Sequence, residues 1–331
     1  MAGNRAGCVS DSGLAPKLSI GLPVYNGERH LRECLDSLLG QSYDDFELII
    51  SDNASTDGTS EICRQYEAMD SRIVYIRQAE NIGRVPNHNF LIEKARGSLF
   101  KWVAADDLYG RDLLKRCVEA LDEHPEVVLA HTRSAIIDES GTVTEFVRYP
   151  VASDSARAPD RFYSMLFDGW GDDSYGVIRT EVIRRTPLHG SYHYADRTFS
   201  IELALHGPFY EVPDWLSFRR EAPDRERSVR VRATYLDPRR ASKIRHPVAR
   251  LYGEYLFAYV FMVQRAPLSV AERRECYGHL VRWVGGRCGP VVRRVVRRES
   301  LRVPAEKAVW ANPPQILLRD VVAGQDRRSL G

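Results

Sequence analysis

Asp106 and Asp107 are adjacent carboxylates that follow Ala105 after the apolar run from Phe100 to Ala104. At the end of a buried strand two such groups repel each other unless a cation offsets their charge. Mg²⁺ or Mn²⁺ prefers oxygen ligands, would supply that charge and would bridge to a diphosphate. The competing interpretation is N-capping of the helix expected from about residue 111, together with its dipole.

Two further polar clusters lie earlier in the chain. Pro23, Tyr25 and Asn26 belong to a turn that offers backbone amides, an aromatic ring and a side-chain amide, which suits a nucleobase or a phosphate. Asp52 follows an apolar run and could accept a hydrogen bond from a base or a ribose hydroxyl. An ordinary strand-to-helix turn and helix capping by residues 55–57 are the alternatives.

Alternating strands and helices are predicted to position these clusters. The predicted strands cover 17–24, 46–50, 72–77, 99–104 and 127–132, and helices are predicted from 28, from 59, from about 86 to a C-cap at Gly97, and over 111–123. Such alternation implies a mostly parallel sheet covered on both faces, with ligands at the carboxyl ends of its strands. Residues 25–28, 52–57, 78–84 and 105–107 all follow strands, so one nucleotide-sized crevice is expected.

Composition narrows the class of protein. The 331 residues carry a formal net charge of +2, which does not favour nucleic acid as a partner. No run approaches the roughly 18 to 20 apolar residues that a membrane helix needs. The six cysteines include no C-x-x-C pair, and Cys34, Cys63 and Cys117 fall on apolar helix faces. Buried free thiols and a cytoplasmic location are therefore expected.

Four motifs taken in order resemble the nucleotide-binding half of the GT-A fold, specifically glycosyltransferase family 2. They are LSIGLPVYNGE at 18–28, SDNASTDGT at 51–59, ENIG at 80–83 and ADD at 105–107. The resemblance covers residues 17–140. It implies a Rossmann-like, mostly parallel sheet with helices on both faces.

The resemblance also implies roles for the residues of these motifs. The base and ribose pocket and its closure would involve Pro23, Tyr25, Asn26, Asp52, Asn81, Gly83 and Arg84. Asp106 and Asp107 would hold the metal on the diphosphate, and Asp106 would thereby contact the donor. Many relatives carry another Asp where this chain has Ala104, which would remove a ribose contact.

The second half of the chain is expected to supply the base and the acceptor pocket. Asp196 is placed in cap position before a predicted helix, where relatives carry a catalytic carboxylate, and a plain N-cap is the alternative. Trp170, Asp172 and Asp173 could stack on and hydrogen-bond a sugar, or could form a surface loop. By the same resemblance, Arg219 or Arg220 would close over the diphosphate.

The expected organisation is a disordered leader over 1–16, a GT-A domain over 17–220 and a charged loop with a mainly helical region over 221–331. Within the GT-A domain, 17–140 would bind the nucleotide and 141–220 the acceptor. The basic, amphipathic segment 291–298 could touch an anionic membrane surface at the inner membrane face or pack on its own protein. The sequence leaves open whether the protein forms a homodimer.

The expected reaction is inverting transfer of a sugar from a UDP- or dTDP-sugar to a glycan, lipid-linked or small-molecule acceptor. One alternative is a weakened, nucleotide-sugar binding protein, because Ala104 and Ala195 stand where relatives carry acids. A nucleotidyltransferase is the other alternative. That class usually carries a basic, Gly-rich loop after the first strand, and here no basic residue of that loop precedes Arg29.

Overall fold

The computed structural model describes residues 15–147, 152–167, 175–192, 194–220 and 247–288. The predicted leader, apart from its last two residues, lies outside this part of the chain. So do the charged loop at 221–246, the basic segment at 291–298 and three predicted acceptor residues, namely Trp170, Asp172 and Asp173.

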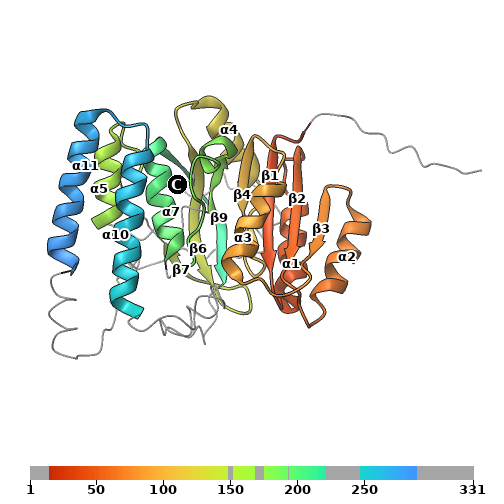
Figure 1. Ribbon diagram of the computed structural model, residues 1–331. Helices are drawn as coiled ribbons and strands as arrows, with labels where there is room; N and C mark the ends of the chain where they lie inside the picture. Colours follow the sequence, from red (N-terminus) through yellow and green to blue (C-terminus); the bar gives the residue numbers. More distant parts are fainter. Residues whose placement is uncertain (1–14, 148–151, 168–174, 193, 221–246, 289–331) are drawn as a thin grey trace, which may run out of the picture.

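The first half of the chain forms a parallel sheet in the order β3-β2-β1-β4 (Figure 1). Its strands are β1 (Leu18–Val24), β2 (Phe46–Asp52), β3 (Ile73–Arg77) and β4 (Leu99–Trp102). The helices between and after them are α1 (Glu28–Leu39), α2 (Thr59–Met69), α3 (Arg84–Lys94) and α4 (Leu113–Glu123). The predicted alternation is therefore confirmed.

Gly97 is not the C-cap of α3, so that prediction is wrong. The helix ends at Lys94, and its C-cap residue is Ala95 in an extended conformation. Gly97 is needed for a different reason, since a Cβ at this position would lie 2.6 Å from the backbone nitrogen of Ser19. The glycine lets the chain pass closely beside β1 on its way into β4.

The second half extends the same sheet through antiparallel pairs and one parallel pair, between β6 and β9. In the described chain the sheet has nine strands, and the additional ones are β5 (Leu108–Tyr109), β6 (Leu129–Ile137), β7 (Val143–Val147), β8 (Val177–Arg179) and β9 (Phe209–Arg220). Of these strands, the sequence pattern predicts only the start of β6. The turn at 138–141 joins β6 to β7, and Gly141 supplies the positive φ of 83° that it requires.

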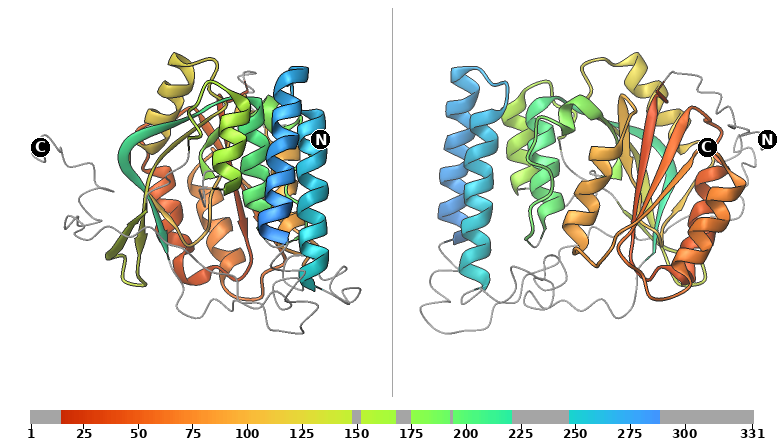
Figure 2. Two further views of the ribbon diagram at one scale, coloured as in Figure 1. Left: turned by 90° about the vertical axis from the view of Figure 1, so that its left-hand side faces the viewer. Right: turned by 45° about the vertical axis from the view of Figure 1, so that its right-hand side comes forward.

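Helices cover both faces of the sheet, as Figure 2 shows. Successive strand residues point to opposite faces, so Ile50 joins an apolar cluster with α1, α2 and α4, while Ile49 joins a cluster on the other face. That second cluster contains α3, α5 (Ala158–Phe167), α6 (Thr180–Ile183) and α7 (Ala195–His206). Cys34, Cys63 and Cys117 are buried free thiols in the first cluster, as predicted.

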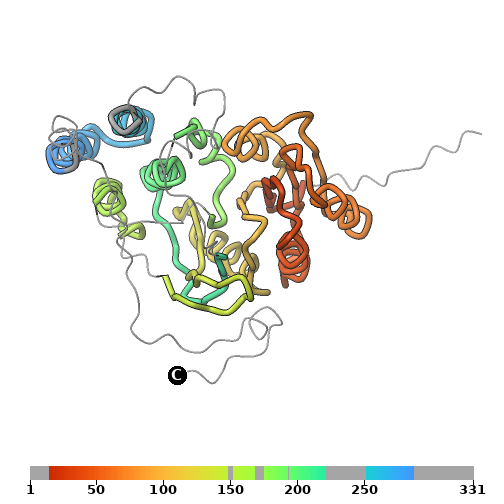
Figure 3. The backbone as a smooth tube through the Cα atoms, turned by 90° about the horizontal axis from the view of Figure 1, so that it is seen from below, coloured from red at the N-terminus to blue at the C-terminus, as the bar shows by residue number. Residues whose placement is uncertain are grey.

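Two C-terminal helices, α10 (Pro247–Arg265) and α11 (Val270–Trp283), are followed by a short π-helical turn, η2 (Val284–Cys288). Figure 3 shows α10 beside α7 and α11 beside α5. Residues of α10 and α11 share the second apolar cluster, and Arg265 forms an ion pair of 2.9 Å with the buried Glu202 on α7. None of the described helices combines the length and apolarity that a membrane crossing needs.

Candidate functional site

The loops after β1 and β2 are joined by hydrogen bonds. Asn26, which has a φ of 52°, donates from its backbone nitrogen to Ser55 Oγ at 2.9 Å, and its side-chain oxygen accepts from the Thr56 backbone at 2.9 Å. Gly27 donates from its backbone nitrogen to Thr59 Oγ1 at 2.9 Å. The two loops therefore form one surface, next to which Tyr25 exposes 42% of its area.

Asp52 lies beneath this surface with none of its area exposed. Its Oδ1 accepts from the Ser55 backbone at 2.8 Å, and its Oδ2 accepts from Ser60 Oγ and Tyr75 OH, each at 2.8 Å. Burial alone would raise the pKa of Asp52, but these hydrogen bonds outweigh it and leave the pKa below its ordinary value. The carboxylate thus holds the shape of the loop, and its direct contact with a base stays a prediction.

Capping explains part of the same loop. Asp57 Oδ1 accepts from the Thr59 backbone at 3.1 Å, and its Oδ2 accepts from the Glu28 backbone at 3.1 Å. In return, Glu28 Oε2 accepts from the Gly58 backbone at 2.9 Å. Two acidic side chains therefore satisfy backbone donors at the starts of α1 and α2, which fixes these helices to each other.

The segment after β3 closes onto the loop after β2. Asn53 donates from its side chain to Asn81 Oδ1 at 2.9 Å and accepts from the Ile82 backbone at 2.9 Å. Gly83 then adopts a φ of 93° at the start of α3, a conformation that favours glycine. Arg84, the first residue of α3, is exposed beside it. The structure thus places the residues predicted for the pocket at one edge of the sheet.

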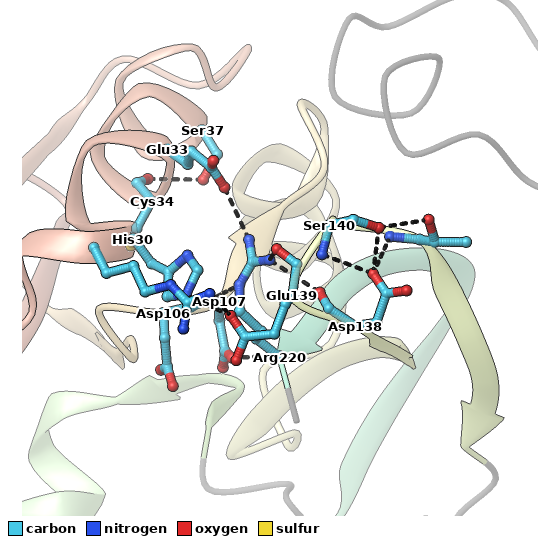
Figure 4. Close-up of polar contacts among 12 residues, drawn as sticks. His30, Glu33, Cys34, Ser37, Asp106, Asp107, Asp138, Glu139, Ser140 and Arg220 are labelled. Atoms are coloured by element: carbon cyan, nitrogen blue, oxygen red, sulfur yellow. Dashed lines mark hydrogen bonds and ion pairs between the residues drawn. The ribbon is translucent and has the colours of Figure 1, made fainter. Parts of the chain in front are cut away.

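Asp106 and Asp107 form a half-buried turn between β4 and β5. They do not cap α4, whose N-cap residue is Asp112, so the capping interpretation is wrong. Asp107 Oδ1 accepts from the Arg220 backbone at 3.0 Å. Within the described residues the Asp106 carboxylate makes no hydrogen bond or ion pair, and in Figure 4 it points away from the Arg220 guanidinium.

The charge of this turn suits a divalent metal ion. Burial raises the pKa of the nearby Cys34 thiol well above its ordinary value, and the negative charges of Asp107 and Asp106 raise it further. Among the described residues no group of three or more His, Cys, Asp or Glu could hold a metal ion. Mg²⁺ and Mn²⁺ can, however, take one or two carboxylates and complete their shell with water and substrate phosphates. The two aspartates fit that arrangement.

Asp196 lies inside the first turn of α7, so its predicted cap position is wrong. The N-cap residue is Tyr194, which has a φ of 58° and makes no side-chain cap hydrogen bond. Asp196 is half-buried, and its Oδ1 accepts from the Arg197 backbone at 2.9 Å. Burial, with a smaller contribution from the Asp196 charge, raises the pKa of Tyr192 to about 12. The carboxylate thus satisfies one backbone donor of the first turn of α7, and its role as a general base stays a prediction.

The predicted arginine pair lies at the end of β9. Arg219 is half-buried, whereas Arg220 exposes only 5% of its area. The Arg220 guanidinium faces Glu33 and the backbone of the aspartate turn, a direction that the sequence pattern does not predict. The cause is the pairing of β9 with β5 and β6, because it brings residue 220 beside residues 106 and 137.

Lys101 is a buried cation that sequence reasoning missed. It exposes 1% of its area on β4, donates to the Tyr175 carbonyl and lies 5.3 Å from the centre of the Tyr109 ring. Burial lowers its pKa to about 8, against opposing effects of Cys117 and Asp107. A lysine in the middle of an apolar strand was the available signal.

Comparisons with known proteins support the family resemblance of the sequence. The model of the family described as "Glycosyl transferase family 2" matches residues 19–186. Glycosyltransferase GlyA of Streptococcus pneumoniae is 35% identical over 33% of this chain and 15% of its own length. TuaG and EpsH of Bacillus subtilis are 32% and 31% identical, over 41% and 56% of this chain. The matches span only about half of these two relatives, 54% and 55% of their lengths.

Solved structures of TarS from S. aureus show the same fold. The structure of its residues 1–349 with UDP has a TM-score of 0.58 at 17% identity, covering 82% of this chain and 73% of that one. The complex with UDP-GlcNAc has a TM-score of 0.59 at 17% identity, covering 81% and 72%. This likeness agrees with the fold class expected from the sequence.

Proposed function

Because the chain belongs to glycosyltransferase family 2, we propose that it transfers a hexosyl or deoxyhexosyl group from a UDP- or dTDP-sugar to a hydroxyl acceptor. The observation that carries the proposal is the meeting of the polar strand ends. Asn26 is bonded to the loop after β2, and Asn53 of that loop is bonded to Asn81 after β3. The Asp106–Asp107 turn follows β4 in the same parallel sheet. The TarS complexes with UDP and UDP-GlcNAc favour a uridine nucleotide over other donors.

The nucleoside would lie on the surface made by the loops after β1 and β2, where Tyr25 offers an exposed ring for stacking on the base. Asp52 would support that surface from below, and Asn81, Gly83 and Arg84 would border it. Asp106 and Asp107 would hold Mn²⁺ or Mg²⁺. When bound, that ion neutralises charge on the departing diphosphate.

Asp196 would take the proton of the acceptor hydroxyl as that oxygen attacks the anomeric carbon. A single displacement of this kind inverts the anomeric configuration and needs one general base. The acceptor is proposed to be a glycan, a lipid-linked precursor or a small molecule, with Trp170, Asp172 and Asp173 as its candidate contacts.

Thermal shift measurements against a panel of nucleotides test the proposal. UDP or dTDP with Mn²⁺ should raise the melting temperature, because a ligand that binds only the native state stabilises it by RT ln(1 + [L]/Kd). GDP serves as the base-specificity control. A shift with NAD or ATP, and none with UDP or dTDP, would contradict the proposed function.

A further inference from the structure

Arg220 connects three separate parts of the site from a nearly solvent-free position (Figure 4). Its Nε donates to the Asp106 carbonyl at 3.1 Å, and its backbone nitrogen donates to Asp107 Oδ1 at 3.0 Å. Its Nη1 donates to the carbonyls of Asp138 and Glu139 at 3.0 and 2.8 Å. Its Nη2 donates to Glu33 Oε2 on α1 at 2.8 Å.

The β6–β7 hairpin is also tied directly to α1. Glu139, at the tip of the hairpin, accepts from Arg29 at 3.0 Å and lies 3.1 Å from His30 Nε2. Glu33 and Glu139 thus attach α1 to Arg220 and to the hairpin that Arg220 binds. The arrangement closes a ring of contacts around the guanidinium.

This ring matters because the Asp106–Asp107 turn carries two adjacent negative charges. Two adjacent carboxylates repel each other, and the Asp106 carboxylate has no hydrogen-bond partner within the described chain. A guanidinium has five donors in a fixed planar fork, so one Arg can fix several acceptors in a defined geometry. Its positive charge also partly offsets the negative charge of the turn before any metal ion binds.

The same contacts argue against Arg220 as a direct ligand of the diphosphate. Four of its hydrogen bonds already use the guanidinium, and only 5% of the residue is exposed. A contact with a phosphate would require breaking bonds to buried carbonyls, which is costly. Its role must therefore be exerted through the residues that it holds.

We propose that Arg220 is a positioning residue that sets the Asp106–Asp107 turn for divalent metal and diphosphate, a role that rests on the proposed function above. It acts on Asp107 through its backbone nitrogen and on Asp106 through the carbonyl oxygen. Glu33 acts one step further out, because it orients the guanidinium. Neither Arg220 nor Glu33 touches the reacting atoms.

Arg220→Lys tests this proposal, because Lys keeps the positive charge but loses the fork geometry. UDP binding is measured by calorimetry at increasing Mn²⁺, and Mn²⁺ binding alone is measured by electron paramagnetic resonance. The variant should bind Mn²⁺ at least tenfold more weakly and should need correspondingly more Mn²⁺ to bind UDP. UDP binding in EDTA should be unchanged, and excess Mn²⁺ should restore turnover.

Arg161→Lys is the matched control. Arg161 exposes 4% of its area and likewise donates to three backbone carbonyls, those of Ala204, Ser155 and Ala156. Its substitution should lower the melting temperature without changing Mn²⁺ affinity. Glu33→Gln covers the case in which Arg220→Lys does not fold, since the Glu33 side chain is 61% exposed. Like Arg220→Lys, Glu33→Gln should weaken Mn²⁺ binding, here several-fold.

The outcomes separate the two proposals. If the parent protein binds UDP with Mn²⁺ but Arg220→Lys, or Glu33→Gln in its place, shows unchanged Mn²⁺ affinity, Arg220 is structural only and the positioning role is overturned. If the parent protein binds neither Mn²⁺ nor UDP, the proposed function itself fails, and the positioning role fails with it.

Discussion

Tyr75 on β3 donates a hydrogen bond from its hydroxyl to Asp52 Oδ2 at the end of β2, over 2.8 Å. The bond joins two neighbouring parallel strands at the edge where the polar loops meet. It also satisfies a carboxylate that has no exposed area. The surface proposed for the nucleobase therefore rests on a buried hydrogen-bonded acid.

Tyr75→Phe should destabilise the protein and spare nucleotide binding. Hydrogen bonds to charged groups contribute about 1.5 to 3 kcal/mol, so the free energy of unfolding should fall by that order. Denaturant titration measures this loss, and calorimetry with UDP should show affinity within a few-fold of the parent. A large loss of UDP affinity with unchanged stability would show that Tyr75 contacts the ligand instead.

Asp52→Asn should have a larger effect that depends on pH. The pKa of Asp52 is lowered in the folded state. The ionised carboxylate therefore contributes to stability above the unfolded pKa of about 4, and this contribution is lost as the pH falls through the folded pKa. The stability difference between parent and variant should therefore shrink below pH 4. Urea unfolding at pH 7, 4 and 3 measures it, and a difference that is constant with pH would contradict this assignment.

His88 and His189 predict a second pH effect, on stability alone. Their rings lie 4.4 Å apart in the core beside Trp102, and neither Nδ1 has a hydrogen-bond partner among the described residues. Burial lowers the pKa of His189 to about 3, with a further contribution from Arg84, and it lowers that of His88 well below its ordinary value. The folded protein thus holds both imidazoles neutral where the unfolded chain is protonated.

The contribution of these neutral histidines to the free energy of unfolding should therefore be complete above pH 6.5 and should fall as the pH decreases. His189→Phe removes one titrating group and keeps an aromatic ring against Phe199. Between pH 6.5 and 5 the variant should lose about 1.5 kcal/mol less than the parent. Unfolding measured at pH 8 isolates the packing effect, because both proteins are then neutral at this site. Equal pH slopes for the two proteins would refute the assignment.

The sequence predicts those parts of the fold whose pattern is local, that is, carried by neighbouring residues in the chain. The periodicity of residues 17–139 and the order of its polar loops identified the parallel sheet and placed Asn26, Asn53 and Asn81 at one edge. Short, irregular strands carry no such period. β5 has two residues, and β9 pairs with β6 across register shifts, so their positions depend on tertiary pairing.

The errors at the site have the same origin. Asp106 and Asp107 resembled caps because β5 is too short to be recognised between them and α4. Asp196 resembled an N-cap because α7 starts two residues earlier than expected, and the left-handed backbone of Tyr194 that precedes it leaves no pattern in the sequence. Arg220 was found as a candidate, but its inward direction depends on a strand pairing that sequence spacing does not reveal.

Asp106→Asn and Asp107→Asn should each abolish the dependence of UDP binding on Mn²⁺, with at least tenfold loss of affinity. Without metal the melting temperature should stay equal or rise, because removing one of two adjacent negative charges relieves their repulsion. In Asp107→Asn the new amide oxygen can still accept from the Arg220 backbone. Asp112→Asn is the control, since Asp112 lies close by in the chain and its carboxylate accepts only from Ser42 within the described residues. Full activity in excess EDTA would contradict the metal assignment.

Asp196→Asn should separate chemistry from folding. An Asn side-chain oxygen can still accept from the Arg197 backbone, so the substitution should cost mainly the helix-dipole term of about 0.3 to 1 kcal/mol and leave melting near normal. Loss of a general base costs roughly 10²- to 10⁴-fold in rate, so kcat should fall at least a hundredfold while calorimetry shows unchanged donor affinity. Asp160→Asn, in the first turn of α5, is the matched control and should retain kcat. Turnover of Asp196→Asn within a few-fold of the parent would place the base elsewhere. Asp172 and Asp173 would then be the next residues to substitute, because they are the other acids proposed near the acceptor.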